Sequence, residues 1–297
     1  MKNIQKNILP FLVIVFLSVN TTCHAQTSSV TDSNVKKEKR KKKKKYRLPK
    51  IDLSHWKVTL PIGKPDEVEP PEILDYANNE SLKKYMYNDS TDGSLVFYAF
   101  PSSKTANTKY SRSELREQMV PGDNNVNWTF EQGGKMRGKL RMGDISKDKK
   151  GKYHKTIIMQ IHGRLTNEQR DLIGQKDNNA PPILKIYWKD GKIRVKTKVL
   201  KNPSASPTEI LKTDAWTDDE GYTFKEKVGF KKFILEVKVS KGKMVVSLND
   251  NEFAVYKDFN IKRWGVFENY FKAGNYLGTK DKGAYAKVKY YQLEVSH

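Results

Sequence analysis

Residues 270–276 read YFKAGNY, and this short stretch carries the strongest indication of both fold and chemistry. A β-strand turns successive side chains to opposite faces, so in an extended segment Lys272, Gly274 and Tyr276 share one face. That face presents a cation and a phenol with a small gap between them. The pattern therefore predicts a strand of a sheet, one face of which carries reactive polar groups.

Two earlier segments follow the same alternation. In SRSELR, residues 111–116, Arg112, Glu114 and Arg116 share a face, and in QIH, residues 160–162, Gln160 and His162 do. Three such strands side by side would line one groove with cations, an amide, an imidazole and a phenol. This set suits a carboxylate-bearing sugar from which an acidic proton is removed.

The rest of the chain also favours strands. No long stretch shows the 3.6-residue apolar period of a helix, and the one helical candidate, residues 71–84, is short. Tight turns are expected at residues 189–192, 240–243 and 249–251. This pattern predicts an all-β fold, a two-sheet sandwich or jelly roll. The expected strands are residues 57–60, 95–100, 155–161, 183–187, 193–199, 233–239, 244–248 and 284–295.

Two segments with turn-forming composition read as loops, residues 164–182 and 201–221. The first directly follows Gln160 and His162. It is placed either to cover the groove as a lid or to run over the surface as a plain loop.

The N-terminal residues 1–25 have the organisation of a signal peptide. Lys2 and Lys6 form a positive start, residues 8–19 form an apolar run, and a small-residue cleavage site precedes Gln26. The apolar run is too short for a comfortable membrane span. We therefore expect export, to the periplasm, the cell surface or the medium, with no transmembrane segment after removal of the leader.

Cys23 is the only cysteine, so no disulfide can form within the chain. It is either discarded with the leader or acylated as a lipoprotein cysteine. Residues 20–22 read NTT, a poor match to the usual approach to a lipid-modified cysteine, so we favour cleavage without lipid. No cluster of His, Asp or Glu has the spacing of metal ligands, and we expect neither a metal nor another cofactor.

The net charge of +22 is unevenly distributed. Residues 36–50 carry eleven Lys or Arg and one Glu, a net +10; the leader adds +2 and residues 26–35 carry −1, which leaves +11 for residues 51–297. The lysine run suggests nucleic-acid binding, but a solvated tether over residues 26–49 is the better interpretation. The basic character of the remaining domain indicates a polyanionic ligand.

The motifs at 112–116, 160–162 and 270–276 resemble, in the same order, the three strand motifs of the polysaccharide lyase family 7 alginate lyases. Residues 53–61, LSHWKVTLP, are also similar to the start of that family's catalytic domain. The resemblance implies a catalytic domain at residues 50–297, a β-jelly roll whose concave sheet forms the substrate groove. One departure is that Leu277-Gly278 stand where the family usually has Asn-Gln, which bears on substrate contacts.

The resemblance implies β-elimination, in which the C5 proton of a uronate is removed and the C4–O bond breaks. Arg112 and Gln160 suit neutralisation of the carboxylate. His162 is suited to act as the base near neutral pH, and Tyr276 can protonate the leaving O4. The ionised form of Tyr276 could itself act as base if nearby cations lowered its pKa. The expected substrate-binding residues are Glu114, Arg116, Lys272, Tyr270 and Asn275.

Each assignment has a structural alternative. A lone His162 on a strand is more often packed or surface-exposed than catalytic. Residues 112–116 could be a solvated strand face with cross-strand pairs, within which Glu114 and Arg116 orient Arg112. Lys272 could bind substrate without taking part in the reaction.

The sequence thus predicts an exported, monomeric lyase that acts on alginate, an anionic polysaccharide. Ile161 is associated in the family with guluronate-containing substrates, which implies guluronate or mixed blocks. Two alternatives are a lyase on another polyuronate such as glucuronan, suggested by Leu277-Gly278, and a non-catalytic jelly roll that binds anionic carbohydrate. Specific nucleic-acid binding through the lysine run is the weakest alternative.

Overall fold

Alternation of buried and solvent-facing side chains builds two large sheets in the computed structural model, which describes residues 48–102 and 109–297. Strand β14 (Phe233–Ser240) shows the pattern most plainly, because every second side chain is buried. The expected leader and all but the last two residues of the expected tether lie outside the described residues. No helix among the described residues is long and apolar enough to cross a membrane.

Both sheets are antiparallel except where β1 joins β18 in parallel. We call them the groove sheet and the back sheet. In order, the groove sheet contains β12 (Trp216–Asp218), β11 (Lys192–Leu200), β10 (Asn179–Lys189), β9 (Thr156–Arg164), β17 (Glu268–Leu277), β6 (Arg112–Glu117), β2 (Trp56–Thr59) and β3 (Glu67–Val68), with β13 (Tyr222–Lys227) on β11 and β7 (Trp128–Thr129) on β17. The back sheet contains β16 (Glu252–Tyr256), β15 (Lys243–Leu248), β14, β8 (Gly134–Ile145), β18 (Ala286–Ser296), β5 (Ser94–Ala99) and β4 (Met86–Asp89), with β1 (Lys50–Ile51) on β18.

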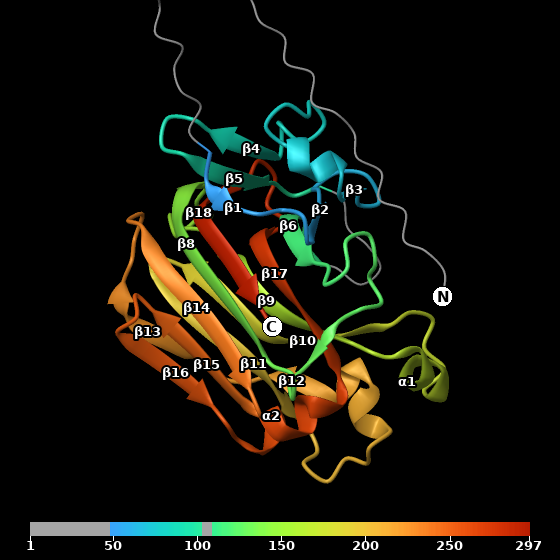
Figure 1. Cartoon of the computed structure of the whole chain (residues 1–297). Helices are drawn as coiled ribbons and strands as arrows, with labels where there is room; N and C mark the ends of the chain where they lie inside the picture. The colour runs from blue at the N-terminus through green and yellow to red at the C-terminus, as the bar shows by residue number, and fades with distance from the viewer. Residues whose placement is uncertain (1–47, 103–108) are drawn as a thin grey trace, which may run out of the picture. The chain divides into compact units, whose positions relative to one another are not determined.

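The two sheets stack as layers, with β8, β14 and β18 lying over β9, β10 and β17 (Figure 1). The hydrophobic core fills the space between them, and its largest fully buried side chains include Trp128, Trp188, Phe97 and Phe271. Each such side chain contributes about 1.5–3 kcal/mol by leaving water. This stacking confirms the predicted two-sheet jelly roll.

The predicted tight turns are also confirmed. Asp190 and Gly191 have φ of 50° and 82°, Lys241 and Gly242 have 44° and 69°, and Asn249-Asp250 have 52° and 59°. Positive φ at both central residues matches the right-handed twist of the strands that a two-residue hairpin joins. These turns determine the register of the two-residue hairpins β10–β11 and β14–β15, whereas β15 and β16 are joined by three residues, 249–251.

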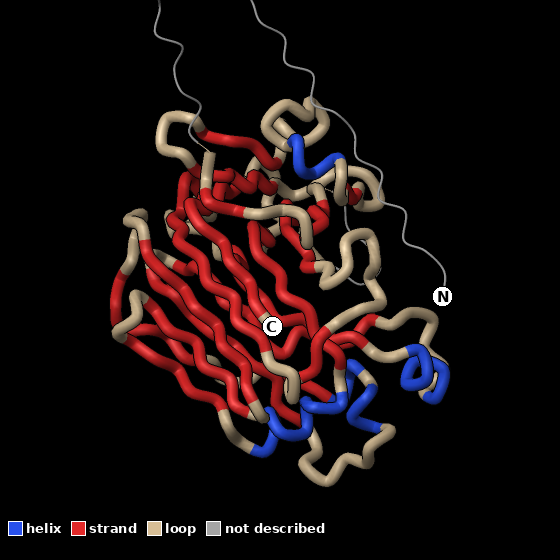
Figure 2. Tube along the Cα trace, viewed as in Figure 1, coloured by secondary structure: helices blue, strands red, loops and turns tan. Residues whose placement is uncertain are grey.

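The helices are short and lie at the margins of the sheets (Figure 2). The expected helix at 71–84 is reduced to the four-residue 3₁₀ helix η1 (Glu72–Asp75) followed by turns. The remaining helices are α1 (Asn167–Leu172), η2 (Glu209–Leu211), η3 (Thr213–Ala215), α2 (Phe259–Arg263) and η4 (Trp264–Val266).

Both predicted loops contain regular structure. The segment 164–182 includes α1, which begins with a capping box between Thr166 and Gln169, and the first residues of β10. The segment 201–221 includes η2, η3 and β12, and it is anchored because Trp216 is buried and donates its indole N–H to the Ile210 carbonyl at 2.7 Å. These elements are short and polar, so a search for apolar runs in the sequence does not detect them.

The sequence prediction missed β8, the longest strand. Its buried positions follow a period of two, but Gly138 interrupts the apolar pattern. A Cβ at Gly138 would lie 2.5 Å from the Met159 Cε of the groove sheet. The glycine thus makes room for a side chain from the facing layer, which a single-strand pattern cannot indicate.

Candidate active site

The groove sheet brings the three predicted motifs onto adjacent strands, because β17 pairs with β6 on one side and β9 on the other. The side chains that alternate toward the groove come together as the sequence predicts. The cross-strand pairs are Lys272 with Arg116 and Gln160, Tyr276 with Arg112, and Tyr270 with His162.

Glu114 is the buried centre of this cluster. Its side chain is fully inaccessible to solvent, and its Oε2 lies 2.6 Å from the Lys272 Nζ. Its Oε1 accepts a hydrogen bond of 2.6 Å from the Gln160 Nε2. One carboxylate therefore orients a cation and an amide at once. Protein groups enclose the Glu114 side chain completely, so the structure favours a role in orienting its neighbours over a contact with substrate.

Arg112 differs from the other cations of the cluster. Its Nε lies 3.8 Å from the Glu114 Oε2, beyond hydrogen-bonding distance. The guanidinium makes no hydrogen bond with any residue that the structure describes, and it lines the pocket. Its planar fork of donors is therefore available to a carboxylate ligand.

His162 is half-buried, and its ring orientation indicates its tautomer. The Nδ1 lies 3.0 Å from the Gly163 carbonyl oxygen, which can only accept, so Nδ1 carries the proton. Burial and the charge of Lys272 lower the pKa of His162 to about 3, against the opposing effect of the Gly163 hydrogen bond. The ring is therefore neutral at neutral pH, with Nε2 free to accept a proton.

Tyr276 is half-buried, and its ring lies 5.8 Å from the Arg112 guanidinium carbon. Burial raises the pKa of Tyr276 above its usual value. Hydrogen bonds from the backbone of Tyr110 and Lys109, and the charge of Arg112, oppose this change without reversing it. The phenol is therefore protonated at neutral pH and can act as a proton donor, and the condition under which Tyr276 would itself act as base, a net lowering of its pKa by cations, is not met.

These side chains face a pocket of about 250 Å³. Five cationic side chains line it, and none of its lining residues among those described is a carboxylate, so it favours an anionic ligand. Sequence reasoning missed several of the lining residues, although Lys185 and Tyr187 alternate on β10 as the known motifs do. The lining comprises Lys109, Tyr110, Arg112, Lys155, Ile157, Gln160, His162, Pro182, Lys185, Tyr187, Lys272, Tyr276 and Gly278.

Two predicted substrate contacts instead support the cluster from the side. The Arg116 guanidinium donates to the Glu117 and Asn124 carbonyls at 2.7 and 2.9 Å and packs over the Tyr270 ring at 4.2 Å. Tyr270 in turn stacks on His162, with ring centroids 5.2 Å apart. Since protein acceptors occupy the Arg116 donors, this residue buttresses the ring pair, and a substrate contact from Arg116 is not supported.

The position of Asn275 does not support the expected substrate contact. Asn275 is fully buried and faces the back sheet, where its amide donates to the Phe97 and Ala286 carbonyls at 3.0 and 2.7 Å. Its side-chain oxygen accepts from the Thr156 hydroxyl at 2.7 Å. Alternation alone places residue 275 opposite Tyr276, so Asn275 fastens the groove strand to the other layer.

A double irregularity in the strands shapes this end of the pocket. Relative to β9, β17 carries an extra residue between Ala273 and Tyr276, and β9 carries an extra Ile158 relative to β10. Such bulges leave ladder groups unpaired and redirect side chains. The fully buried Tyr290 hydroxyl, from β18, donates to the Ile158 carbonyl and accepts from the Gly274 N–H at 3.2 Å. One hydroxyl of the back sheet therefore hydrogen-bonds the backbone groups at both bulges.

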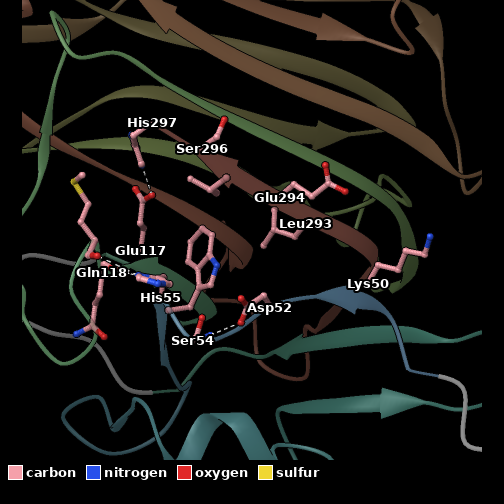
Figure 3. Close-up of a pocket in the computed structure, with 13 residues that line it drawn as sticks. Lys50, Asp52, Ser54, His55, Glu117, Gln118, Leu293, Glu294, Ser296 and His297 are labelled. Carbon is pink, nitrogen blue, oxygen red and sulfur yellow. Dashed lines mark hydrogen bonds and ion pairs between the residues drawn. The ribbon is translucent and has the colours of Figure 1, made fainter.

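A second pocket, of about 470 Å³, lies between residues 50–56, the end of β6 and the end of β18 (Figure 3). None of the predicted site residues lines it. Glu117, on its wall, accepts from the His297 Nε2 at 2.7 Å and from the Phe271 backbone N–H at 2.9 Å. Burial alone would lower the pKa of His297, but the hydrogen bond and charge of Glu117 outweigh it and raise the pKa. This pair supports β17 from behind the groove.

A two-sheet jelly roll whose groove gathers cations, an amide, a neutral imidazole and a phenol has the architecture of a carbohydrate-active enzyme for anionic polymers. The family model for alginate lyase matches residues 51–297, and the chain belongs to this family. It is therefore a polysaccharide lyase. A comparison with curated proteins found no match.

Several solved structures are similar to the chain. A variant of family 7 alginate lyase A1-II′ in complex with substrate (GGMG) is 28% identical, with a TM-score of 0.66 and coverage of 83% of this chain and 94% of that one. A variant of the same lyase with product (GGG) is 27% identical, with a TM-score of 0.66 and coverage of 82% and 96%. Alginate lyase PA1167 from Pseudomonas aeruginosa, 22% identical over 83% of this chain and 100% of its own, with a TM-score of 0.61, shares the fold.

Proposed function

We propose that the domain at residues 50–297 cleaves 1,4-linked alginate by β-elimination and releases unsaturated uronate oligosaccharides. The observation that carries this proposal is the joint presence, in one cationic pocket, of a guanidinium without hydrogen bonds to the described residues, an oriented amide, a neutral imidazole and a protonated phenol. Binding alone would need the cations but not a proton acceptor beside a proton donor. A purely carbohydrate-binding role is therefore disfavoured.

The roles follow from the charge that each step develops. Arg112 and Gln160 bind the uronate carboxylate and stabilise the enolate-like intermediate that forms when C5 loses its proton. The Nε2 of His162 accepts that proton. The electron pair then forms the C4–C5 double bond, the C4–O bond breaks, and the Tyr276 hydroxyl protonates the departing oxygen. Lys272, held by Glu114, supplies positive charge beside the carboxylate, and Tyr270 keeps the imidazole in place.

We further propose activity on guluronate-containing or mixed blocks, and export directed by residues 1–25. The solved structures of a relative with product (GGG) and with substrate (GGMG) support the proposed activity on guluronate-containing or mixed blocks. Ile161 is fully buried in the core, so any link between this residue and block preference would act through packing. Gly278 lines the pocket, and a Cβ at this position would lie 3.1 Å from the Lys155 Cγ. The glycine that stands here in place of the family's usual Gln therefore leaves space for the Lys155 side chain.

The purified full chain is expected to produce an increase in ultraviolet absorbance on alginate as the new double bonds form. Polyguluronate, polymannuronate, mixed blocks and glucuronan, assayed side by side, give the substrate preference from relative rates. The Tyr276→Phe variant serves as the matched inactive control. If folded protein binds alginate without forming double bonds, the proposed activity is wrong. If glucuronan is cleaved faster than alginate, the proposed substrate is wrong.

Tyr290→Phe is expected to lower kcat roughly ten- to a hundredfold with little change in KM, because losing the bridging hydroxyl loosens the bulge that aims Tyr276. Tyr291→Phe is the matched control. The Tyr291 hydroxyl donates to the Asp92 Oδ2 at 2.8 Å, and this hydrogen bond lies away from the groove. Steady-state kinetics on protein quantified as folded separates the two effects. A loss of thermal stability with unchanged kcat in Tyr290→Phe would assign the hydroxyl to stability alone.

A further inference from the structure

One register row of polar side chains crosses the groove sheet at right angles to its strands. Because adjacent strands lie about 4.8 Å apart, a polymer lying across them passes one position of this row at each strand, although Lys57 and Arg116 are buried and already paired with protein acceptors. The row lies on the groove face, and five of its six members are cations. Its members are Lys57 on β2, Arg116 on β6, Lys272 on β17, Gln160 on β9, Lys185 on β10 and Lys196 on β11.

The row changes character immediately after the pocket. Lys185 lines the pocket next to Gln160, and its Nζ lies 2.5 Å from the Asp218 Oδ2. The Asp218 Oδ1 lies 2.9 Å from the Nζ of Lys198. Lys198 on β11 is the residue directly opposite Asp218 on β12. Both lysine side chains are mostly buried, whereas the Asp218 side chain is 29% exposed. A protein carboxylate is thus clamped between two ammonium groups at the position next to the reaction site.

The strand that supplies Asp218 is firmly held. Asp219 accepts from the Thr197 backbone N–H at 2.9 Å and from its hydroxyl at 3.1 Å, and Trp216 is buried in the core. Burial would raise the pKa of Asp218, but hydrogen bonds from Lys185 and Lys198 reverse this and lower the pKa. The carboxylate is therefore ionised at neutral pH and presents the chemical group that a uronate of the polymer would present.

We propose that Asp218 is an internal substitute for a substrate carboxylate, which fills the uronate site between Lys185 and Lys198 and ends the row of productive subsites on this side of the pocket. The inference rests on the proposed alginate lyase function. A polymer that extends past Lys185 must displace a carboxylate that is already in place. The affinity of the protein for an oligomer therefore rises with added sugars only until the oligomer reaches this position.

Asp218→Asn is expected to lower KM for long alginate oligomers by roughly three- to tenfold, because two ammonium groups lose their internal partner and become available to a uronate. Oligomers too short to reach the site are expected to keep their KM. The gain is expected to shrink in high salt, which screens attraction between the lysines and the polymer. Kinetics over a series of oligomer lengths, with product sizes followed by chromatography, measures both effects.

Asp250→Asn is the matched control. Asp250 lies 2.6 Å from Arg137 on the back sheet, so the variant loses one ion pair and one negative charge away from the groove. Equal changes in the two variants would overturn the proposal, as would a gain independent of oligomer length or weaker binding of long oligomers to Asp218→Asn. In the double variant Asp218→Asn with Lys198→Met, the gain is expected to disappear, which separates an opened site from a disturbed strand.

A binding measurement keeps this inference separate from the proposed function. Calorimetric titration of uncut alginate oligomers into Tyr276→Phe, with and without Asp218→Asn, needs no turnover. If oligomers bind but wild-type protein does not cleave them, the proposed function fails while the length dependence still tests Asp218. If Asp218→Asn leaves the affinity for long oligomers unchanged while wild-type protein cleaves alginate, the inference alone is wrong.

Discussion

His162→Ala is expected to lower kcat about 10²- to 10⁴-fold with a modest change in KM, because it removes a group that acts mainly in the transition state. Tyr276→Phe is expected to produce a comparable loss, since it removes the proton donor for the leaving oxygen. Because burial raises the pKa of Tyr276, its phenol is not a ready base. The His162→Ala loss is therefore expected on both guluronate and mannuronate blocks.

The pH dependence of the wild-type enzyme checks this assignment. The acid limb of kcat/KM reports the free enzyme, in which the pKa of His162 is about 3, so it is expected well below the ordinary value of 6.5. The acid limb of kcat is expected at higher pH, because a bound carboxylate offsets the surrounding cations and raises the pKa. Small and equal losses in His162→Ala on both block types would rule out a base at this position. Retained mannuronate cleavage would instead assign the base role there to Tyr276.

Glu114→Gln is expected to lower kcat/KM by about a hundredfold, since truncating one partner of a buried charge pair costs about 2–5 kcal/mol. The remaining amide cannot hold Lys272 as a cation. In the wild-type enzyme burial already lowers the pKa of Lys272 to about 8, with Glu114 opposing this change. Without the carboxylate the pKa of Lys272 falls further, and Gln160 loses the acceptor that orients its amide.

A double-mutant cycle with Lys272→Met measures this dependence. If Glu114 acts through Lys272, Glu114→Gln is expected to cost much less in the Lys272→Met background than in the wild type. Glu236→Gln, which breaks the 3.1 Å pair with Arg137 on the back sheet, is the control for loss of a charge. Additive losses would contradict the coupling and leave orientation of Gln160 as the role of Glu114. Kinetics at several pH values also test whether affinity decreases from about pH 8 upward, where wild-type Lys272 loses its proton.

Period-two alternation was sufficient to place five site residues on the groove face. Arg112, Gln160, His162, Lys272 and Tyr276 all line the pocket, because a strand has only two faces and each motif is contained within one strand. The same rule, applied consistently, also assigns residue 275 to the opposite face. The expected substrate contact by Asn275 treated the motif as a contiguous binding segment, which alternation does not support.

Other features depended on long-range contacts that no local pattern contains. The burial of Glu114 follows from pairing β6 with β17, and the pKa values of His162 and Lys272 follow from that burial. Asp218 reaches the groove only because β12 folds back on β11, twenty residues later in the chain.

The amino-acid sequence by itself therefore determined the strands that carry the three motifs, the tight turns and the face on which each reactive side chain lies, because these depend on φ, ψ and the alternation of a few neighbouring residues. Only the tertiary structure decided which carboxylate pairs with which cation, how Tyr290 completes the bulges beneath Tyr276, and where the row of subsites meets Asp218. These features depend on desolvation and on contacts between strands far apart in sequence, and both arise only when the two sheets close over a common core.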